Sequence, residues 1–179
     1  MGGESAGGQL ERLNAWSAAL ARQELLACCS SARWAMEVAS GRPYASVDEV
    51  IARSQESVAG LTQADLQEAL AGHPRIGDRA TSAPVSGEPA GASWSRDEQA
   101  GVDSADRATA QALAEGNAAY ERRFGHIYLV CATGRSGPEL LALLRERLGN
   151  DPAAEWDVVR GELAKINQIR LRKLLEGAV

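Results

Sequence analysis

Apolar residues recur along most of this chain with the spacing of an α-helix. Leucines follow a roughly helical spacing in residues 10–20, and residues 22–39 form a second helical stretch that ends before Gly41. Side chains three and four positions apart share one face of a helix, so this spacing predicts two amphipathic helices in the N-terminal part of the chain.

Pairs of hydroxyl and acidic residues mark where further helices begin. A Ser or Thr followed three residues later by an acidic residue is typical of a capping box at a helix N-terminus. Three such pairs precede apolar helical patterns: Ser46 with Glu49, Thr62 with Asp65, and Ser136 with Glu139. Gly72 is placed to end the helix that Thr62 begins, because glycine is favoured just past a helix C-terminus.

The C-terminal half of the chain continues this pattern. We predict a helix from Ser95 to about Arg123, one over residues 136–148, and a last one from an Asn-Asp-Pro sequence to about Leu175. The run HIYLVCAT at 126–133 is the one strand-like stretch, and it fits a buried helix segment or an extended connector equally well. The pattern predicts an all-α fold of about seven helices in one compact domain over residues 10–179, after a disordered lead-in at residues 1–9.

Composition narrows the possible functions. The chain has 179 residues, of which 45% are hydrophobic and 4% aromatic, and its net charge is -5. An acidic chain is a poor match to nucleic acid, which needs a surplus of Lys and Arg. No apolar run of about 18 residues predicts a membrane span, and the N-terminus lacks the pattern of a secretion signal. The three cysteines form no C-x-x-C motif, so we expect buried thiols in a reducing compartment.

His73 is one of only two histidines in the chain, the other being His126. It ends a helix and precedes Pro74, which restricts its backbone and stiffens the exit from the helix. A rigid imidazole beside a loop suits acid–base chemistry near neutral pH. The same position also suits a histidine that only stabilises the helix C-terminus, and both interpretations stay open.

The segment SWSRDEQ at 93–99 carries Ser95 and Glu98 in capping-box spacing, which can be purely structural. Alternatively, the free N–H groups of a helix N-terminus can bind an anion, and the Gln99 amide can bind a planar imide or urea.

Arg170 continues the inward stripe of the last helix, because it lies four residues after Ile166. A guanidinium near a core needs an anionic partner, either an internal carboxylate or the carboxylate of a substrate. A metal site that combines His73, Asp78, Glu98 and His126 is a weaker alternative, since no His pair has metal-binding spacing.

Several segments together resemble the 2-oxo-4-hydroxy-4-carboxy-5-ureidoimidazoline (OHCU) decarboxylases of urate degradation. The segments are RPYAS (42–46), GHPRIGD (72–78), SWSRDEQAGV (93–102), YERRFGHIYLVCATGRS (120–136) and ELAKINQIRLRKLL (162–175). Each motif is short, but the series in this order is specific, and it covers nearly the whole chain from about Leu10.

The resemblance implies an all-α homodimer that converts OHCU to (S)-allantoin without a metal or organic cofactor. It implies His73, Glu98 and Arg170 as catalytic residues. It also implies substrate contacts at Pro74, Ser95, Arg96, Asp97, Gln99, Tyr128, Leu129, Val130, Cys131 and Ala132. The HPRIGD form is similar to the bacterial branch, which implies a cytoplasmic protein. From the acidic charge and the lack of a long apolar run, we expect that it binds neither nucleic acid nor membrane.

Two other functions remain to be tested against the structure. A non-catalytic helical dimer or scaffold would leave the three catalytic candidates scattered. A metal-dependent hydrolase would use His73 and His126 as ligands.

Overall fold

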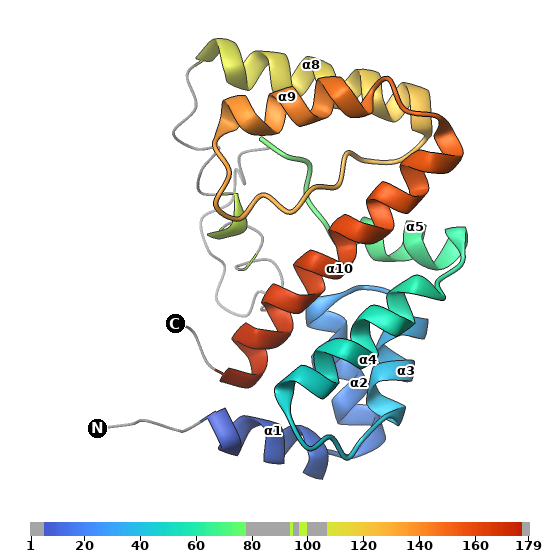
Figure 1. Cartoon of the computed structure of the whole chain (residues 1–179), viewed down its shortest axis with the longest axis vertical. Helices are drawn as coiled ribbons and strands as arrows, with labels where there is room; N and C mark the ends of the chain where they lie inside the picture. Colours follow the sequence, from blue (N-terminus) through green and yellow to red (C-terminus); the bar gives the residue numbers. More distant parts are fainter. Residues whose placement is uncertain (1–5, 78–93, 95–96, 100–106, 177–179) are drawn as a thin grey trace. The chain divides into compact units, whose positions relative to one another are not determined.

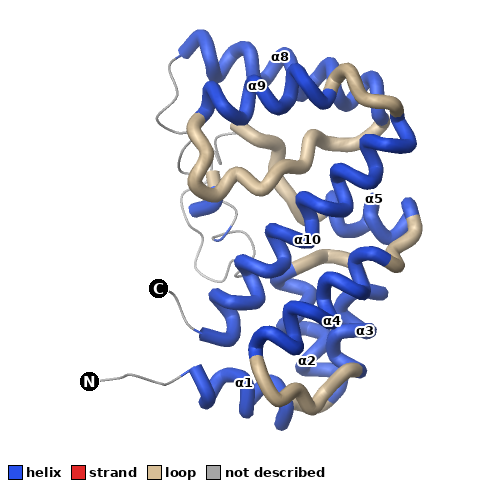
Figure 2. The backbone as a smooth tube through the Cα atoms, in the orientation of Figure 1, coloured by secondary structure: helices blue, strands red, loops and turns tan. Residues whose placement is uncertain are grey.

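The computed structural model describes residues 6–77, 94, 97–99 and 107–176, and within them it contains helices and loops but no strand (Figures 1 and 2). The helices with defined bounds are α1 (Ala6–Ala15), α2 (Ala18–Cys28), α3 (Ala32–Ser40), α4 (Val47–Ala59), α5 (Gln63–Ala71), α8 (Arg107–Phe124), α9 (Gly137–Arg147) and α10 (Pro152–Glu176). The predicted all-α fold is confirmed for these residues, with eight bounded helices in place of about seven.

The chain divides into two compact units. Unit 1 comprises residues 1–69 and 164–179, and unit 2 comprises residues 70–163. The boundaries fall inside α5 and α10, so each of these helices contributes residues to both units. Compact units within one chain are not by themselves separate domains, and one domain over residues 10–179 stays a prediction.

Unit 1 has a core of small and apolar side chains from its own helices. Helix α2 packs against α3, and α3 packs against α4. Trp34 of α3 is fully buried, and its indole N–H donates a hydrogen bond to the Ser54 hydroxyl of α4 at 3.1 Å. This bond satisfies the one polar atom of the largest side chain in the core.

Serine caps divide the N-terminal helices more finely than the leucine pattern indicated. Ser17 caps α2 by accepting a hydrogen bond from the Leu20 N–H at 3.2 Å, and Ser31 caps α3 through the Trp34 N–H at 3.3 Å. The predicted helices over 10–20 and 22–39 were therefore wrong in extent, because an N-cap residue leaves helical geometry. Helix α1 also begins at Ala6, inside the lead-in of residues 1–9 that was expected to be disordered.

All three predicted helix starts are confirmed, two of them with reciprocal capping boxes. At Ser46 only half of the box forms, because its hydroxyl accepts from the Glu49 N–H at 3.2 Å whereas the Glu49 carboxylate accepts from the Ala45 N–H at 2.8 Å. Thr62 and Asp65 bond each other's backbone N–H groups at 2.8 and 3.2 Å. The Glu139 carboxylate accepts from the Ser136 N–H at 2.7 Å. Local side-chain chemistry thus fixes where α4, α5 and α9 begin.

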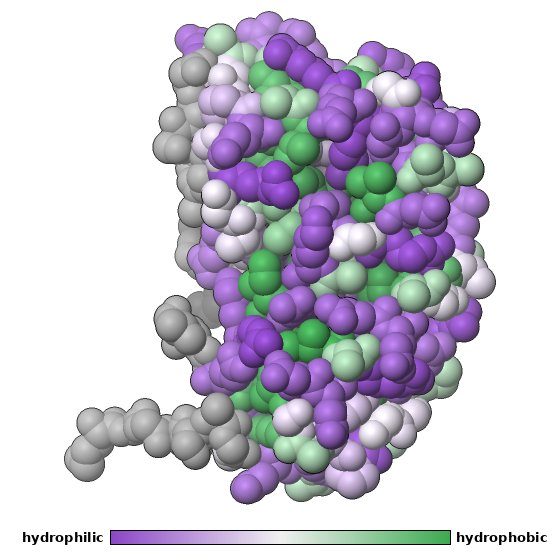
Figure 3. All heavy atoms as spheres, viewed as in Figure 1, coloured by the Kyte–Doolittle hydropathy of each residue, from purple (hydrophilic) through white to green (hydrophobic). Residues whose placement is uncertain are grey.

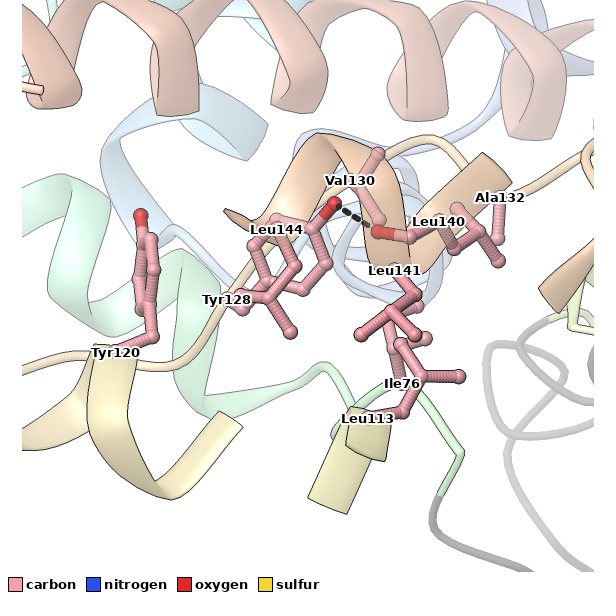
Figure 4. Packing of buried hydrophobic residues seen from close by; sticks show 9 residues of the cluster. All are labelled: Ile76, Leu113, Tyr120, Tyr128, Val130, Ala132, Leu140, Leu141 and Leu144. Atoms are coloured by element: carbon pink, nitrogen blue, oxygen red, sulfur yellow. Dashed lines mark hydrogen bonds between the residues drawn. The ribbon is translucent and has the colours of Figure 1, made fainter. Parts of the chain in front are cut away.

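Unit 2 is built around the packing of α8 on α9. Nine buried residues from these helices and two loops form its core: Ile76, Leu113, Tyr120, Tyr128, Val130, Ala132, Leu140, Leu141 and Leu144 (Figure 4). Gly116 marks the close approach of the two helices, since a Cβ there would lie 2.6 Å from Leu144 Cδ2. Its absent side chain allows the contact, which explains a glycine in the middle of α8.

Two predicted elements of unit 2 need correction or resolution. The helix expected over 95–123 is interrupted, because Glu98 is helical but Gln99 lies in a turn, and α8 begins at Arg107. Residues 126–133 form an extended connector, which settles the open choice between helix, strand and connector. The stretch at 80–94 is rich in Gly, Pro and Ser, a composition that predicts a long loop, and it lies outside the described residues apart from Trp94.

Apolar side chains are mostly enclosed in the described part of the chain. On the face drawn in Figure 3, hydrophobic residues form small patches among hydrophilic ones. The large hydrophobic residues that are exposed in the described ranges are Leu20, Leu26 and Met36. No helix in these ranges is long and apolar enough to cross a bilayer.

Candidate active site

The loop that carries His73 leaves the end of α5. The His73 N–H donates to the Leu70 carbonyl at 3.0 Å, which closes the last turn just after Gly72. His73 is half-buried, whereas the following Pro74 is exposed. Because Pro74 restricts the backbone of the preceding His73, the direction in which the chain leaves α5 at this residue is defined.

Residues 75–77 are fastened to α8 directly after this proline. The Asn117 amide donates to the Ile76 carbonyl at 2.7 Å, and the Ile76 side chain is buried in the core of unit 2. The Arg75 guanidinium pairs with the Glu121 carboxylate through contacts of 2.5 and 2.9 Å. This pairing lowers the pKa of Glu121. Polar and apolar contacts together hold the loop on which His73 stands.

Gln99 joins the Glu98 segment to the same loop. Its amide oxygen accepts from the Gly77 N–H at 3.0 Å, and its amide nitrogen donates to the Arg75 carbonyl at 3.3 Å. Gly77 has a φ of 83°, a conformation that favours glycine. The sequence suggested Gln99 as a substrate ligand, but in this structure both ends of its amide bind the loop backbone.

These bonds place residues 97–99 beside the loop of His73. Glu98 and Gln99 are half-buried and Asp97 is exposed, while Ser95 and Arg96 lie outside the described residues. His73 and Glu98 both belong to unit 2, and the Gln99 clamp connects the segments that carry them. The clamp was missed in the sequence analysis, because nothing in the residue pattern pairs position 99 with positions 75 and 77.

The extended segment Tyr128–Ala132 is buried along its length, with exposed fractions of 1–8%. Arg147 of α9 donates to the Leu129 carbonyl at 2.6 Å, and Glu162 of α10 accepts from the Cys131 N–H at 2.8 Å. The backbone of this segment is thus held from both α9 and α10.

A buried ionic network supports this segment. Glu155 is fully buried, and its carboxylate accepts from the Arg147 guanidinium at 2.5 and 2.8 Å and from the Tyr120 hydroxyl. The Arg147 guanidinium also lies 4.9 Å from the centre of the Tyr128 ring. Burial raises the pKa of Tyr128 to about 12, so its hydroxyl stays protonated and donates to the Leu140 carbonyl at 3.1 Å (Figure 4).

Arg170 is buried as predicted, with 2% of its surface exposed. Its Nη1 donates to the carbonyl of Cys28 at 3.1 Å, and Cys28 is the last residue of α2. The C-terminal carbonyls of a helix carry partial negative charge, so the end of α2 is a partner for this guanidinium. From the sequence we expected a carboxylate as the partner, whereas this bond is made to a backbone carbonyl. Arg170 belongs to unit 1, unlike His73 and Glu98.

His126 packs among aromatic rings. Its ring centre lies 4.1 Å from that of Trp156, and its Nδ1 lies 3.0 Å from the Ile127 carbonyl oxygen. Burial lowers the pKa of His126, which keeps the imidazole neutral. Asp78, the other acidic residue of the metal-site alternative, lies outside the described residues, and in the described ranges no three His, Cys, Asp or Glu side chains group as metal ligands.

Solved structures show the same fold. The structure of an OHCU decarboxylase in the presence of (S)-allantoin has a TM-score of 0.71 and 28% identity, and the match covers 85% of this chain and 96% of the other. A structure of (S)-allantoin synthase has a TM-score of 0.65, with 92% of this chain and 53% of the other covered. Its identity of 17% supports a likeness of fold alone.

Curated relatives point to the same family. The uric acid degradation bifunctional protein TTL of Arabidopsis thaliana is 30% identical over 155 residues, or 87% of this chain. This chain spans only about half, 47%, of that longer protein. The 2-oxo-4-hydroxy-4-carboxy-5-ureidoimidazoline decarboxylase of Amia calva is 33% identical over 147 residues, and the match covers 79% of each chain. The protein of the same name from Haloferax volcanii is 25% identical over 139 residues, covering 77% of this chain and 79% of the other.

The family model for OHCU decarboxylase matches residues 14–172, a range that contains His73, Glu98 and Arg170 together with the clamp of Gln99 and the segment Tyr128–Ala132. A match over most of the chain, supported by both kinds of relative, disfavours the scaffold and metal-hydrolase alternatives. The chain belongs to the OHCU decarboxylase family.

Proposed function

We propose that this chain decarboxylates OHCU to (S)-allantoin in urate degradation, without a metal or organic cofactor. The observation that carries the proposal is the family match over residues 14–172, which includes every residue that we assign to the reaction. The sequence alone led to the same substrate through the resemblance of its motifs.

In the proposed mechanism, Arg170 binds and orients the carboxylate that leaves. A guanidinium can bind a carboxylate through two parallel hydrogen bonds. Burial and the bond to the Cys28 carbonyl support this role, because both fix the direction of the guanidinium before the substrate arrives. The bond between the ring carbon and the carboxylate breaks, and carbon dioxide leaves.

The electron pair of the broken bond forms a double bond from the hydroxyl-bearing carbon to the neighbouring ureido-bearing carbon, and the electrons of the ring C=N bond at that neighbour move to its nitrogen, which takes up a proton. The substrate is thus its own electron sink. His73, with Glu98 nearby, donates a proton to the ureido-bearing carbon, while the hydroxyl gives up its proton and becomes a ring carbonyl. Delivery of the proton to one face gives the S product. The clamp of Gln99 supports this pairing, because it ties the Glu98 segment to the loop of His73.

The remaining substrate contacts belong to two segments. The turn at residues 95–99 and Pro74 would line the site on the side of His73. Backbone groups of the segment Tyr128–Ala132 would hold the ring edge, and the bonds of Leu129 to Arg147 and of Cys131 to Glu162 support this role because they fix the position of the segment.

Freshly made OHCU tests the function directly. Urate is oxidised to supply OHCU, and the appearance of allantoin is followed by circular dichroism with and without the purified chain. We expect faster formation of a single enantiomer. Racemic allantoin at the uncatalysed rate would refute the proposal.

We also propose that the active form is a cytoplasmic homodimer that binds neither nucleic acid nor membrane. The family resemblance and the net charge of -5 support this proposal. Light scattering on the purified chain should give twice the mass of one chain, and fractionation of the source cells should recover the chain with cytoplasmic markers. A monomer mass at micromolar concentration would contradict the dimer.

A further inference from the structure

Asn167 of α10 carries a buried amide that the proposed mechanism does not use. Its side chain is fully buried. Among the described residues, neither its amide oxygen nor its amide nitrogen has a partner in good hydrogen-bond geometry, and its interaction with the Cys29 thiol is a weak one. Buried amides in folded proteins nearly always have partners, because an unpartnered one loses the hydrogen bonds it made to water. This position therefore suggests a partner that binds from outside the chain.

Asn167 lies next to the guanidinium that we assign to the substrate carboxylate. Residues three apart share one face of a helix, so Asn167 and Arg170 lie one above the other on α10. Both act on the Cys29 thiol, whose pKa burial raises to about 11 while Asn167 and Arg170 lower it in part. The amide and the guanidinium thus flank the same thiol, which as a weak donor and acceptor cannot replace full amide partners.

Asn167 is as deeply buried as Arg170, the residue that we assign to substrate binding. Arg170 is 2% exposed and Asn167 is 0% exposed, so both polar groups are enclosed to the same degree. Both belong to unit 1, and both lie within the matched residues 14–172.

We propose that Asn167 binds the ureido group of the substrate, beside the carboxylate that Arg170 holds; this inference rests on the proposed function. An amide offers one acceptor oxygen and two N–H donors, and a ureido group offers the complementary set. A carboxylate only accepts hydrogen bonds, and a guanidinium only donates them. The two side chains therefore bind two chemically different groups of one small molecule.

Replacement of Asn167 by leucine separates ligand binding from packing. Leucine has a similar size and no polar atoms, so Asn167→Leu should raise the Tm of the ligand-free protein by about 2–4 °C. Loss of two hydrogen bonds to a neutral group should lower kcat/KM for OHCU by about 10- to 100-fold.

(S)-allantoin is the second probe, because it keeps the ureido group and lacks the carboxylate. We expect it to raise the Tm of the wild-type chain and to leave the Tm of Asn167→Leu unchanged. Gln168→Leu is the matched control on the next position of α10, where the side chain is partly exposed and bonds Gln55 at 3.4 Å. The control should keep both the activity and the allantoin shift.

Two outcomes would overturn this inference alone. In the first, Asn167→Leu decarboxylates OHCU as fast as an active wild type. In the second, (S)-allantoin raises the Tm of the variant as much as that of the wild type. Either result would mean that the amide does not bind the substrate. If Asn167→Leu does not fold, the smaller Asn167→Ser takes its place, because serine cannot make both hydrogen bonds of the amide. This variant must then show the lower kcat/KM and the lost effect of (S)-allantoin on Tm. A wild type that fails to accelerate decarboxylation would instead overturn the proposed function.

Discussion

Replacing Arg147 by methionine should lower the free energy of unfolding more than a substitution at the surface does. The change removes the cation from Glu155, which is fully buried and accepts two hydrogen bonds from the guanidinium. It also removes the bond to the Leu129 carbonyl and the contact with the Tyr128 ring. Breaking a buried ion pair from one side leaves an uncompensated charge and costs about 3–5 kcal/mol.

For a chain of this length, each kcal/mol shifts Tm by about 2–4 °C, so Arg147→Met should lower Tm by roughly 6–20 °C. Urea unfolding followed by far-UV circular dichroism measures the free energy directly. Arg145→Met is the matched control, because Arg145 lies in the same last turn of α9 and is exposed. The control should change stability by less than about 0.5 kcal/mol.

Removal of the buried carboxylate tests whether its unpaired charge causes this loss. The double variant Arg147→Met with Glu155→Leu should recover much of the lost stability. A loss below about 1 kcal/mol, or a double variant no more stable than Arg147→Met, would refute the reasoning.

The other predictions concern single positions. His73→Asn should reduce turnover at least 100-fold while far-UV circular dichroism stays unchanged, since general acid catalysis contributes about 10²–10⁴-fold; near-normal turnover would remove His73 from the mechanism. Burial lowers the pKa of His126, so the unfolded chain binds a proton that the folded chain does not. The contribution of His126 to the free energy of unfolding should therefore be complete above about pH 6.5 and decrease as the pH falls below that value. His126→Phe should flatten this dependence, and an unchanged slope in urea unfolding would contradict the assignment. Gly116→Ala should cost about 1–3 kcal/mol by the same measurement, although alanine favours helices, because its Cβ would meet Leu144 at 2.6 Å; a stabilised variant would show that α8 and α9 can separate locally.

Local signals in the sequence were enough for most helix boundaries and for the burial of Arg170. A capping box involves residues three apart, and an inward stripe involves residues three and four apart, so both can be recognised without knowing the fold. The N-caps at Ser17 and Ser31 follow the same chemistry. They were missed because neither is followed by an acidic residue three positions later, and the apolar pattern runs on across both breaks.

The supports of the candidate site could not be predicted in this way. The pairing of Gln99 with residues 75–77 joins positions more than 20 apart, and Arg147 reaches Leu129 across 18 positions. Such bonds depend on how α8, α9 and the connector pack. In the sequence, Arg147 has the pattern of a cation at a helix C-terminus, which usually faces solvent. The family resemblance predicted the candidate residues, and the structure shows what holds several of them in place.

The three cysteines give each compact unit its own chemical reporter. Cys28 and Cys29 are buried in unit 1 and Cys131 is buried in unit 2. A thiol reacts with an alkylating reagent only as the exposed thiolate, and Cys29, with a pKa of about 11, is almost entirely protonated at neutral pH. Mass spectrometry after timed alkylation would therefore record how often each unit opens in the native protein, with no engineered label.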